Sequence, residues 1–106
     1  MLSSSDARIL RRFKHRLQKI TPVTRLVVYG SRARGEAVPE SDLDLFIEVP
    51  ALDPALRRRI SELAWEISLE NGILISTLVA SPQAILDSPL GANPILRVIE
   101  TEGIAV

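Results

Sequence analysis

The residue types with the clearest chemical meaning lie between residues 30 and 47. Gly30 and Ser31 are followed, after ten residues, by Asp42 and Asp44 at the start of an apolar run. Glycine allows a sharp turn or close approach of the backbone to a ligand, and serine offers a hydroxyl group. Magnesium prefers carboxylate and phosphate oxygens as ligands. The pattern therefore predicts a site for a nucleoside triphosphate and its metal ion.

The alternation of side chains along a strand gives the two aspartates a common face. Asp42 and Asp44 would lie about 6 to 7 Å apart along the strand, with Phe46 and Glu48 beyond them. The opposite face is a continuous apolar set that predicts a core: Leu43, Leu45, Ile47 and Val49. Two neighbouring carboxylates repel each other unless a cation lies between them. Metal binding is thus the expected use of the polar face.

Two arginines after the Gly-Ser turn offer positive charge to a phosphate. Arg32 and Arg34 are two residues apart, so on a helical turn both cannot face the same ligand, and Arg32 is preferred.

Two other phosphate-binding motifs do not match the sequence. Gly30 and Gly35 fit the glycine frame of a P-loop, but Glu36 follows where lysine is required, and the dinucleotide fingerprint is absent.

Composition describes an ordinary globular chain. Its length of 106 residues predicts a single domain, and fractions of 46% hydrophobic and 25% charged residues are ordinary for a globular protein. No apolar stretch approaches the roughly 20 residues of a membrane span. With no cysteine and no signal peptide pattern, the expected location is the cytoplasm.

Charge is unevenly distributed along the chain although its net value is zero. Residues 1–34 carry nine Lys or Arg against Asp6 alone, giving +8, and residues 35–106 carry four against twelve acidic residues, giving −8. The basic side of the first helix either faces an anionic partner or is simply solvated. His15, the single histidine, lies on this side and is expected to be exposed.

Hydrophobic periodicity and cap signals place these residues on a small set of elements. Ser4 or Ser5 can cap the first helix, and two later helices begin at Asp53-Pro54 and Asn93-Pro94. The expected helices are 4–20, 54–70, 82–86 and 94–101, and the expected strands are 25–29, 43–49 and 73–79. This order predicts an α/β or α+β fold, a small mixed sheet of three or more strands flanked by helices. Strand direction stays open, because the link between the first two strands is near the lower limit for a crossover.

The spacing of the candidate site is similar to that of a known superfamily. Gly30-Ser31, ten residues and Asp42-Leu43-Asp44 resemble the motif of the DNA polymerase β-like nucleotidyltransferases, and the run Gly-Ser-Arg-Ala-Arg-Gly resembles its minimal nucleotidyltransferase (MNT) branch. The resemblance implies nucleotide binding by Gly30, Ser31, Arg32 and Arg34, and two Mg²⁺ ions held by the catalytic Asp42 and Asp44. It also implies transfer of a nucleoside monophosphate, AMP from ATP, to a hydroxyl group with release of pyrophosphate.

One position departs from the family pattern. The resemblance implies a third carboxylate on the strand 73–79, and Ser76 occupies that position. A serine does not replace a carboxylate as a base or metal ligand. Glu48, Glu66 and Glu70 are alternatives from elsewhere in the chain. A catalytically degenerate nucleotide- or partner-binding module therefore remains an alternative to an active enzyme.

The resemblance also implies a partner protein. Small MNT proteins resemble antitoxins that neutralise a HEPN-type toxin and adenylylate it on a tyrosine hydroxyl. A small-molecule nucleotidyltransferase acting as a homodimer is the other enzymatic alternative, with Trp65 or the C-terminal helix as the contact. Direct binding of nucleic acid by the basic helix ranks last, because Phe13, the aromatic residue beside it, belongs to the apolar stripe.

Overall fold

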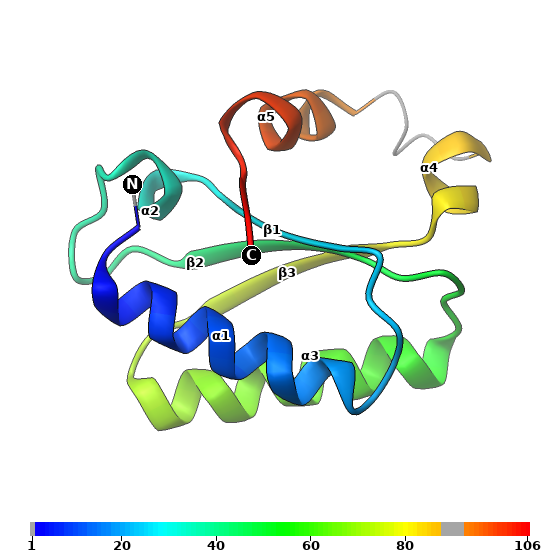
Figure 1. The fold of residues 1–106 in the computed structure, drawn as a ribbon, viewed down its shortest axis with the longest axis horizontal. Coiled ribbons are helices and arrows are strands. Elements are labelled where there is room, and N and C mark those ends of the chain that lie inside the picture. The colour runs from blue at the N-terminus through cyan, green and yellow to red at the C-terminus, as the bar shows by residue number, and fades with distance from the viewer. Residues whose placement is uncertain (1, 88–92) are drawn as a thin grey trace.

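The computed structural model describes residues 2–87 and 93–106 as one mixed sheet with helices on both of its faces (Figure 1). The helices are α1 (Ser4–Gln18), α2 (Ser31–Arg34), α3 (Pro54–Asn71), α4 (Pro82–Asp87) and α5 (Pro94–Glu102), and the strands are β1 (Arg25–Tyr29), β2 (Leu43–Glu48), β3 (Ile75–Ala80) and β4 (Ile104–Ala105). The predicted fold class is confirmed.

The strand order is β3-β2-β1-β4, and the pairing of the strands settles the direction that the sequence left open. β1 and β2 are antiparallel, whereas β2 and β3 are parallel and joined through α3. β4 pairs antiparallel with β1, Val28 lying opposite Ile104. A strand at 104–105 was not predicted, because a two-residue strand is too short to show a period.

Most element ends lie within two residues of those expected from the sequence. The cap of α1 is Ser3 rather than Ser4 or Ser5, its side chain accepting a hydrogen bond from the Asp6 N–H. α1 ends at Gln18, two residues early, and β2 ends one residue early at Glu48. β3 begins at Ile75 rather than 73, where the Ile75 N–H donates to the buried Ser68 hydroxyl at 3.0 Å.

Three predicted caps are confirmed. The side chain of Asp53 accepts a hydrogen bond from the Leu56 N–H at 2.7 Å, and Asn93 caps α5 in the same way. Gly72 ends α3 in the left-handed conformation, with φ of 65°, as the Asn-Gly signal predicts. None of the helices in the described ranges is long and apolar enough to cross a membrane.

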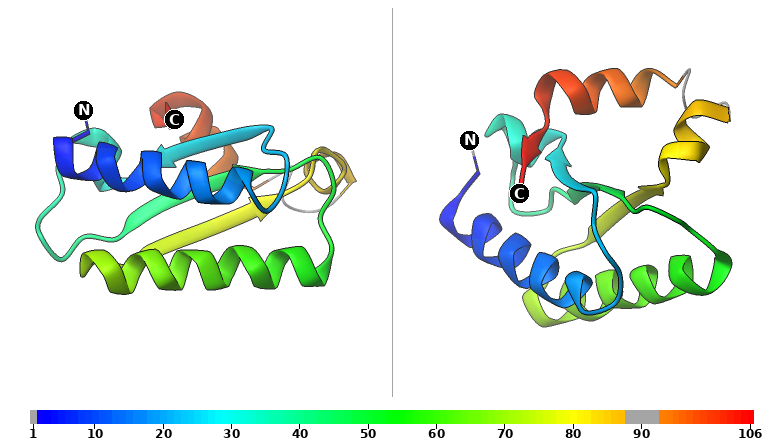
Figure 2. Two further views of the ribbon diagram at one scale, coloured as in Figure 1. Left: turned by 60° about the horizontal axis from the view of Figure 1, so that its bottom comes forward. Right: turned by 45° about the vertical axis from the view of Figure 1, so that its right-hand side comes forward.

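The main hydrophobic core lies between one face of the sheet and the helices α1 and α3 (Figure 2). The predicted core residues of β2 are all fully buried in it, together with the apolar stripe of α1: Leu43, Leu45, Ile47, Val49, Leu10, Phe13 and Leu17. The amphipathic patterns of β2 and α1 were therefore interpreted correctly. His15 is exposed, as expected.

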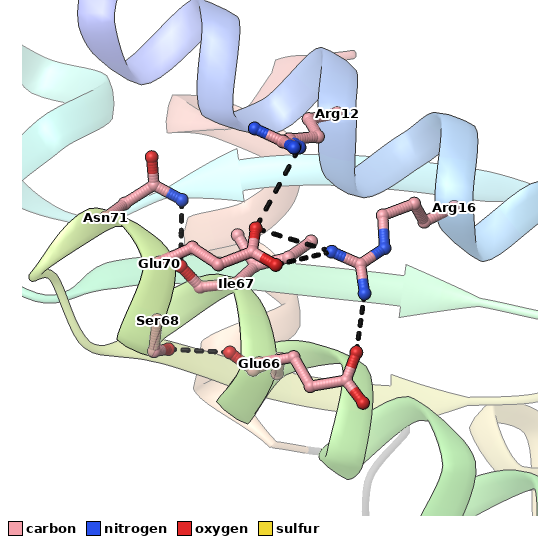
Figure 3. Close-up of polar contacts among 8 residues, drawn as sticks. Arg12, Arg16, Glu66, Ile67, Ser68, Glu70 and Asn71 are labelled. Atoms are coloured by element: carbon pink, nitrogen blue, oxygen red, sulfur yellow. Dashed lines mark hydrogen bonds and ion pairs between the residues drawn. The ribbon is translucent and has the colours of Figure 1, made fainter.

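Ion pairs join the outer sides of α1 and α3 (Figure 3). Arg16 contacts both Glu66 and Glu70, the latter at 3.2 Å, and Arg12 lies 3.9 Å from Glu70. Part of the basic side of α1 is thus neutralised within the molecule. Exposed pairs of this kind contribute little individually, typically below about 1 kcal/mol.

A second, smaller apolar cluster covers the other face of the sheet beneath α5. Its buried members are Val27, Phe46, Ala80 and Ile99. Arg25 lies over the Phe46 ring, 5.2 Å from its centroid, and pairs with Glu48 and Glu100. The sequence placed Phe46 and Glu48 on the polar face, but did not predict that α5 would cover them.

Candidate functional site

The candidate site forms where β1 ends, α2 begins and β2 starts, at one end of the sheet (Figure 1). Tyr29, the last residue of β1, lies opposite Asp44 in the antiparallel register. Gly30 and Ser31 follow Tyr29 immediately. The tertiary structure therefore brings the Gly-Ser turn and Asp44 together.

Gly30 has a conformation and a neighbour that together require glycine. Its φ of 79° and ψ of −160° lie in a region that other residues rarely adopt. A Cβ atom at this position would overlap the Oδ2 atom of Asp44. The missing side chain thus creates the space that the Asp44 carboxylate occupies. Gly35, with φ of 75°, then ends α2 after a single turn.

The two aspartates are differently exposed and share no hydrogen-bond donor. Asp42 is exposed and Asp44 is partly buried, and neither side chain forms a hydrogen bond with any residue in the ranges described. Burial raises the pKa of Asp44, the negative charge of Asp42 raises it further, and Arg34 opposes the shift. Burial and the Asp44 charge also raise the pKa of Tyr29. A cation between the carboxylates would relieve this repulsion.

The oxygen donors of Asp42 and Asp44 fit a hard cation such as Mg²⁺. Within residues 2–87 and 93–106, no group of three His, Cys, Asp or Glu residues is arranged to hold a metal. Ser76 is exposed and lies beside Asp44 in the parallel register of β2 and β3. The site therefore offers a pair of carboxylates, with a hydroxyl group on the adjacent strand.

The glutamates considered as a third carboxylate have other partners. Glu48 is buried and pairs with Arg25 at 3.2 Å. Glu66 and Glu70 pair with α1 on the opposite side of the sheet. These contacts separate all of them from the Asp42–Asp44 pair.

Arg32 and Arg34 leave α2 in different directions. Arg32 is nearly buried and pairs with the buried Asp6 of α1 at 3.1 Å, and its Nε atom donates to the Ser41 carbonyl at 2.9 Å. Arg32 thus joins α1, α2 and the loop before β2. Arg34 is exposed, pairs with Glu36 and Glu102 at 3.2 and 3.1 Å, and is close enough to Asp44 to lower its pKa.

Asp6 was not identified from the sequence as part of this arrangement. It is 4% exposed, although acidic residues are rarely buried without a partner. The available signal was its position as the single acidic residue among the first 34, which marks it as the natural partner for an arginine. Arg32, which the sequence favours as the phosphate ligand, is thus held by Asp6 and Ser41, whereas Arg34 is exposed near Asp44 and held by surface ion pairs.

Comparisons with known proteins agree with this geometry. The curated relatives include the bifunctional uridylyltransferase/uridylyl-removing enzymes of Burkholderia vietnamiensis and Burkholderia lata, each 42% identical over 57 residues. The match covers 50% of this chain and 7% of each relative, so the chain corresponds to a small part of their length.

Solved structures show the same fold over most of the chain. A toxin-antitoxin complex with AMP-PNP superposes with a TM-score of 0.60 at 17% identity, covering 92% of this chain and 69% of the other. A mutant of the MntA-HpeT toxin-antitoxin superposes with a TM-score of 0.61 at 16% sequence identity, covering 90% of this chain and 69% of the other. A structure described as a minimal nucleotidyltransferase superposes with a TM-score of 0.62 at 26% sequence identity, covering 94% of this chain and 90% of the other.

The family model of the nucleotidyltransferase domain matches residues 8–102, a range that contains the Gly-Ser turn, both aspartates and the sheet that positions them. The family model and the fold together confirm the resemblance to the MNT branch. This chain belongs to the nucleotidyltransferase domain family.

Proposed function

We propose that this chain transfers a nucleoside monophosphate from a nucleoside triphosphate to a hydroxyl group of a partner protein. The observation that carries the proposal is the placement of the Asp44 carboxylate against Gly30, beside Ser31 and Asp42. The hydroxyl oxygen of the acceptor attacks the α-phosphorus, and the bond from that phosphorus to the bridging oxygen breaks. Pyrophosphate leaves, and the hydroxyl proton passes to water.

Each residue of the site has a distinct proposed role. Ser31 and Arg34 bind phosphate oxygens, and Gly30 leaves room for the carboxylate beside them. Asp42 and Asp44 would hold Mg²⁺, which neutralises phosphate charge and assists departure of pyrophosphate when bound. Arg32 acts as a positioning residue through Asp6 and the loop before β2. Arg34 must exchange Glu102 for phosphate when the nucleotide binds.

ATP is the proposed nucleotide and the toxin of a toxin-antitoxin pair the proposed acceptor. Two structures with this fold are of toxin-antitoxin proteins, and one of them contains AMP-PNP. The MNT resemblance points to a HEPN-type toxin. UTP is the competing nucleotide, since the curated relatives are uridylyltransferases. A cytoplasmic location follows from an intracellular partner of this kind.

The test is incubation of the chain with Mg²⁺, the protein encoded beside it and ATP or UTP labelled at the α-phosphate. We expect label on the partner from ATP, and none with Asp42→Ala or Asp44→Ala. Glu40→Ala is the matched control, because Glu40 is an exposed acidic residue in the same loop. Absence of label from the wild type, with ATP binding intact by calorimetry, would contradict transfer.

A binding module without catalysis is the second candidate, favoured by Ser76 beside Asp44. In that case, Asp42→Ala with Asp44→Ala would still neutralise the partner completely. Ser76→Asp distinguishes the two further. A carboxylate there would raise the affinity for Mn²⁺, measured by electron paramagnetic resonance, and increase labelling if the missing acid limits an active site.

A further inference from the structure

Arg34 is held between two glutamates from different parts of the chain. Its Nε atom donates to Glu36 at 3.2 Å, and its Nη1 atom donates to Glu102 at 3.1 Å. Among the residues that the structure describes, Nη2 has no hydrogen-bond partner. A bidentate contact with a phosphate group needs two neighbouring nitrogens of the guanidinium group. Arg34 can therefore form such a contact only by giving up one of the two glutamates.

Glu36 and Glu102 differ in how freely they can follow Arg34. Glu36 is two residues away in the chain, so its exposed side chain can move together with Arg34. Glu102 is the last residue of α5 and lies 68 residues away in sequence. Its position depends on the packing of a separate element. Movement of Arg34 toward a phosphate group therefore breaks the contact with Glu102 rather than the contact with Glu36.

The end of α5 is anchored to the sheet by backbone contacts. The Gly103 N–H donates to the Ile99 carbonyl at 3.0 Å. A Cβ atom on Gly103 would overlap that carbonyl oxygen and the side chain of Val27, so the chain lies directly against β1 here. α5 then leads into β4, which pairs with β1 (Figure 1). Because this backbone is fixed, Glu102 cannot follow Arg34 away from α5.

We infer that Glu102 is a positioning residue that competes with the triphosphate for Arg34, so that nucleotide binding releases the end of α5 from α2. The inference rests on the proposed function, because it requires Arg34 to bind phosphate. Two contacts that exclude each other at one group weaken each other. Loss of the Glu102 carboxylate should therefore strengthen nucleotide binding, whereas loss of a residue that only supports the fold would weaken it.

The test is calorimetric titration of the chain with ATP and Mg²⁺ in the absence of an acceptor. Glu102→Gln should bind ATP about two- to fivefold more tightly than the wild type, which corresponds to one exposed ion pair. Glu100→Gln is the matched control, because Glu100 also joins α5 to the sheet, through Arg25 at 2.8 Å, but at the far end of β1 from the candidate site. This control should leave the affinity unchanged. An affinity of Glu102→Gln equal to or below that of the wild type would overturn the inference.

Hydrogen exchange of residues 95–106 measures the release of α5 directly. ATP should accelerate exchange of these amides about two- to fivefold in the wild type, because α5 loses its contact with Arg34. A bound ligand usually has the opposite effect, since it stabilises the folded state. In Glu102→Gln the exchange should already be fast, and ATP should not change it. Unchanged or slower exchange in the wild type on ATP binding would contradict the release.

Arg34→Gln separates failure of this inference from failure of the proposed function. If the wild type binds ATP and Arg34→Gln binds it about tenfold more weakly, Arg34 contacts phosphate and the Glu102 variant decides the inference. If the wild type binds no ATP, or Arg34→Gln binds it normally, both are wrong. A gain in affinity for Glu36→Gln without one for Glu102→Gln would also overturn the inference, because Glu36 would then be the glutamate that Arg34 gives up.

Discussion

The two faces of the sheet differ in what they bury, although β2 contributes alternate residues to both. The α1/α3 face carries Leu43, Leu45 and Ile47 into the large core. The α5 face carries Asp44 and Phe46, one at the open site and the other in the small cluster. The first face is dominated by apolar contacts, with ion pairs only at the outer sides of α1 and α3, whereas the second combines a few apolar contacts with ion pairs and unpaired carboxylates.

This difference shows how a short strand serves stability and chemistry at once. The period of two separates the residues, so a change on one face leaves the other in place. The α5 face also tolerates the repulsion between Asp42 and Asp44, because the core on the opposite face already holds β2 in position. Substitutions on the two faces should therefore have separable effects.

The largest effect is expected for Leu45→Ala. Truncation of this fully buried side chain leaves a cavity in the main core and should lower the free energy of unfolding by about 3 kcal/mol, measured in urea. Asp44→Ala, one residue away, should lose metal-dependent nucleotide binding with no loss of stability. Equal destabilisation by both would show that the two faces are not independent.

Arg32→Gln and Arg34→Gln should separate a positioning arginine from a ligand-binding one. The Arg32 change leaves the buried Asp6 without its cation and should lower the free energy of unfolding by about 2 to 3 kcal/mol. The Arg34 change should leave the unfolding curve unaltered and weaken ATP binding about tenfold, measured by calorimetry. If Arg34→Gln binds ATP normally, the assignment of Arg34 to phosphate is wrong.

Gly30→Ala should cost about 2 kcal/mol of unfolding free energy, through its positive φ and the contact of the new Cβ with Asp44. Gly72→Ala is the matched control, since Gly72 also has a positive φ but has open space around its Cβ position. Its expected cost is about 1 kcal/mol. Only Gly30→Ala should also abolish nucleotide binding, and similar behaviour of both variants would argue against the Asp44 contact.

The smallest effect is a gain in stability for Asp44→Asn. Because the folded protein raises the Asp44 pKa, its ionised form destabilises the fold at neutral pH, and this penalty disappears as pH falls below the ordinary carboxyl range. At pH 7 the variant should be more stable by a few tenths of a kcal/mol, allowing for solvent screening. Thermal melts between pH 7 and pH 3 should show this gap closing. Glu40→Gln is the control expected to show no gap.

Much of the fold could be predicted from particular residues. Asp53-Pro54, Asn71-Gly72 and Asn93-Pro94 marked helix ends through local hydrogen bonds and backbone preferences, which depend on neighbours in the chain. The alternation in β2 identified its core face for the same reason. β4 and the cover of α5 over Phe46 were missed, because they depend on pairing between segments about 50 to 80 residues apart.

The features of the candidate site likewise divide into those that follow from local sequence and those that depend on distant contacts. By itself, the sequence determined the Gly30-Ser31 turn, the spacing to Asp42 and Asp44 and their common strand face, because these follow from glycine geometry and the strand period. The tertiary structure alone decided that Arg32 binds Asp6 while Arg34 stays exposed, and that Glu48 pairs with Arg25. These are contacts between distant parts of the chain, and their choice depends on how the strands align and the helices pack rather than on local residue order.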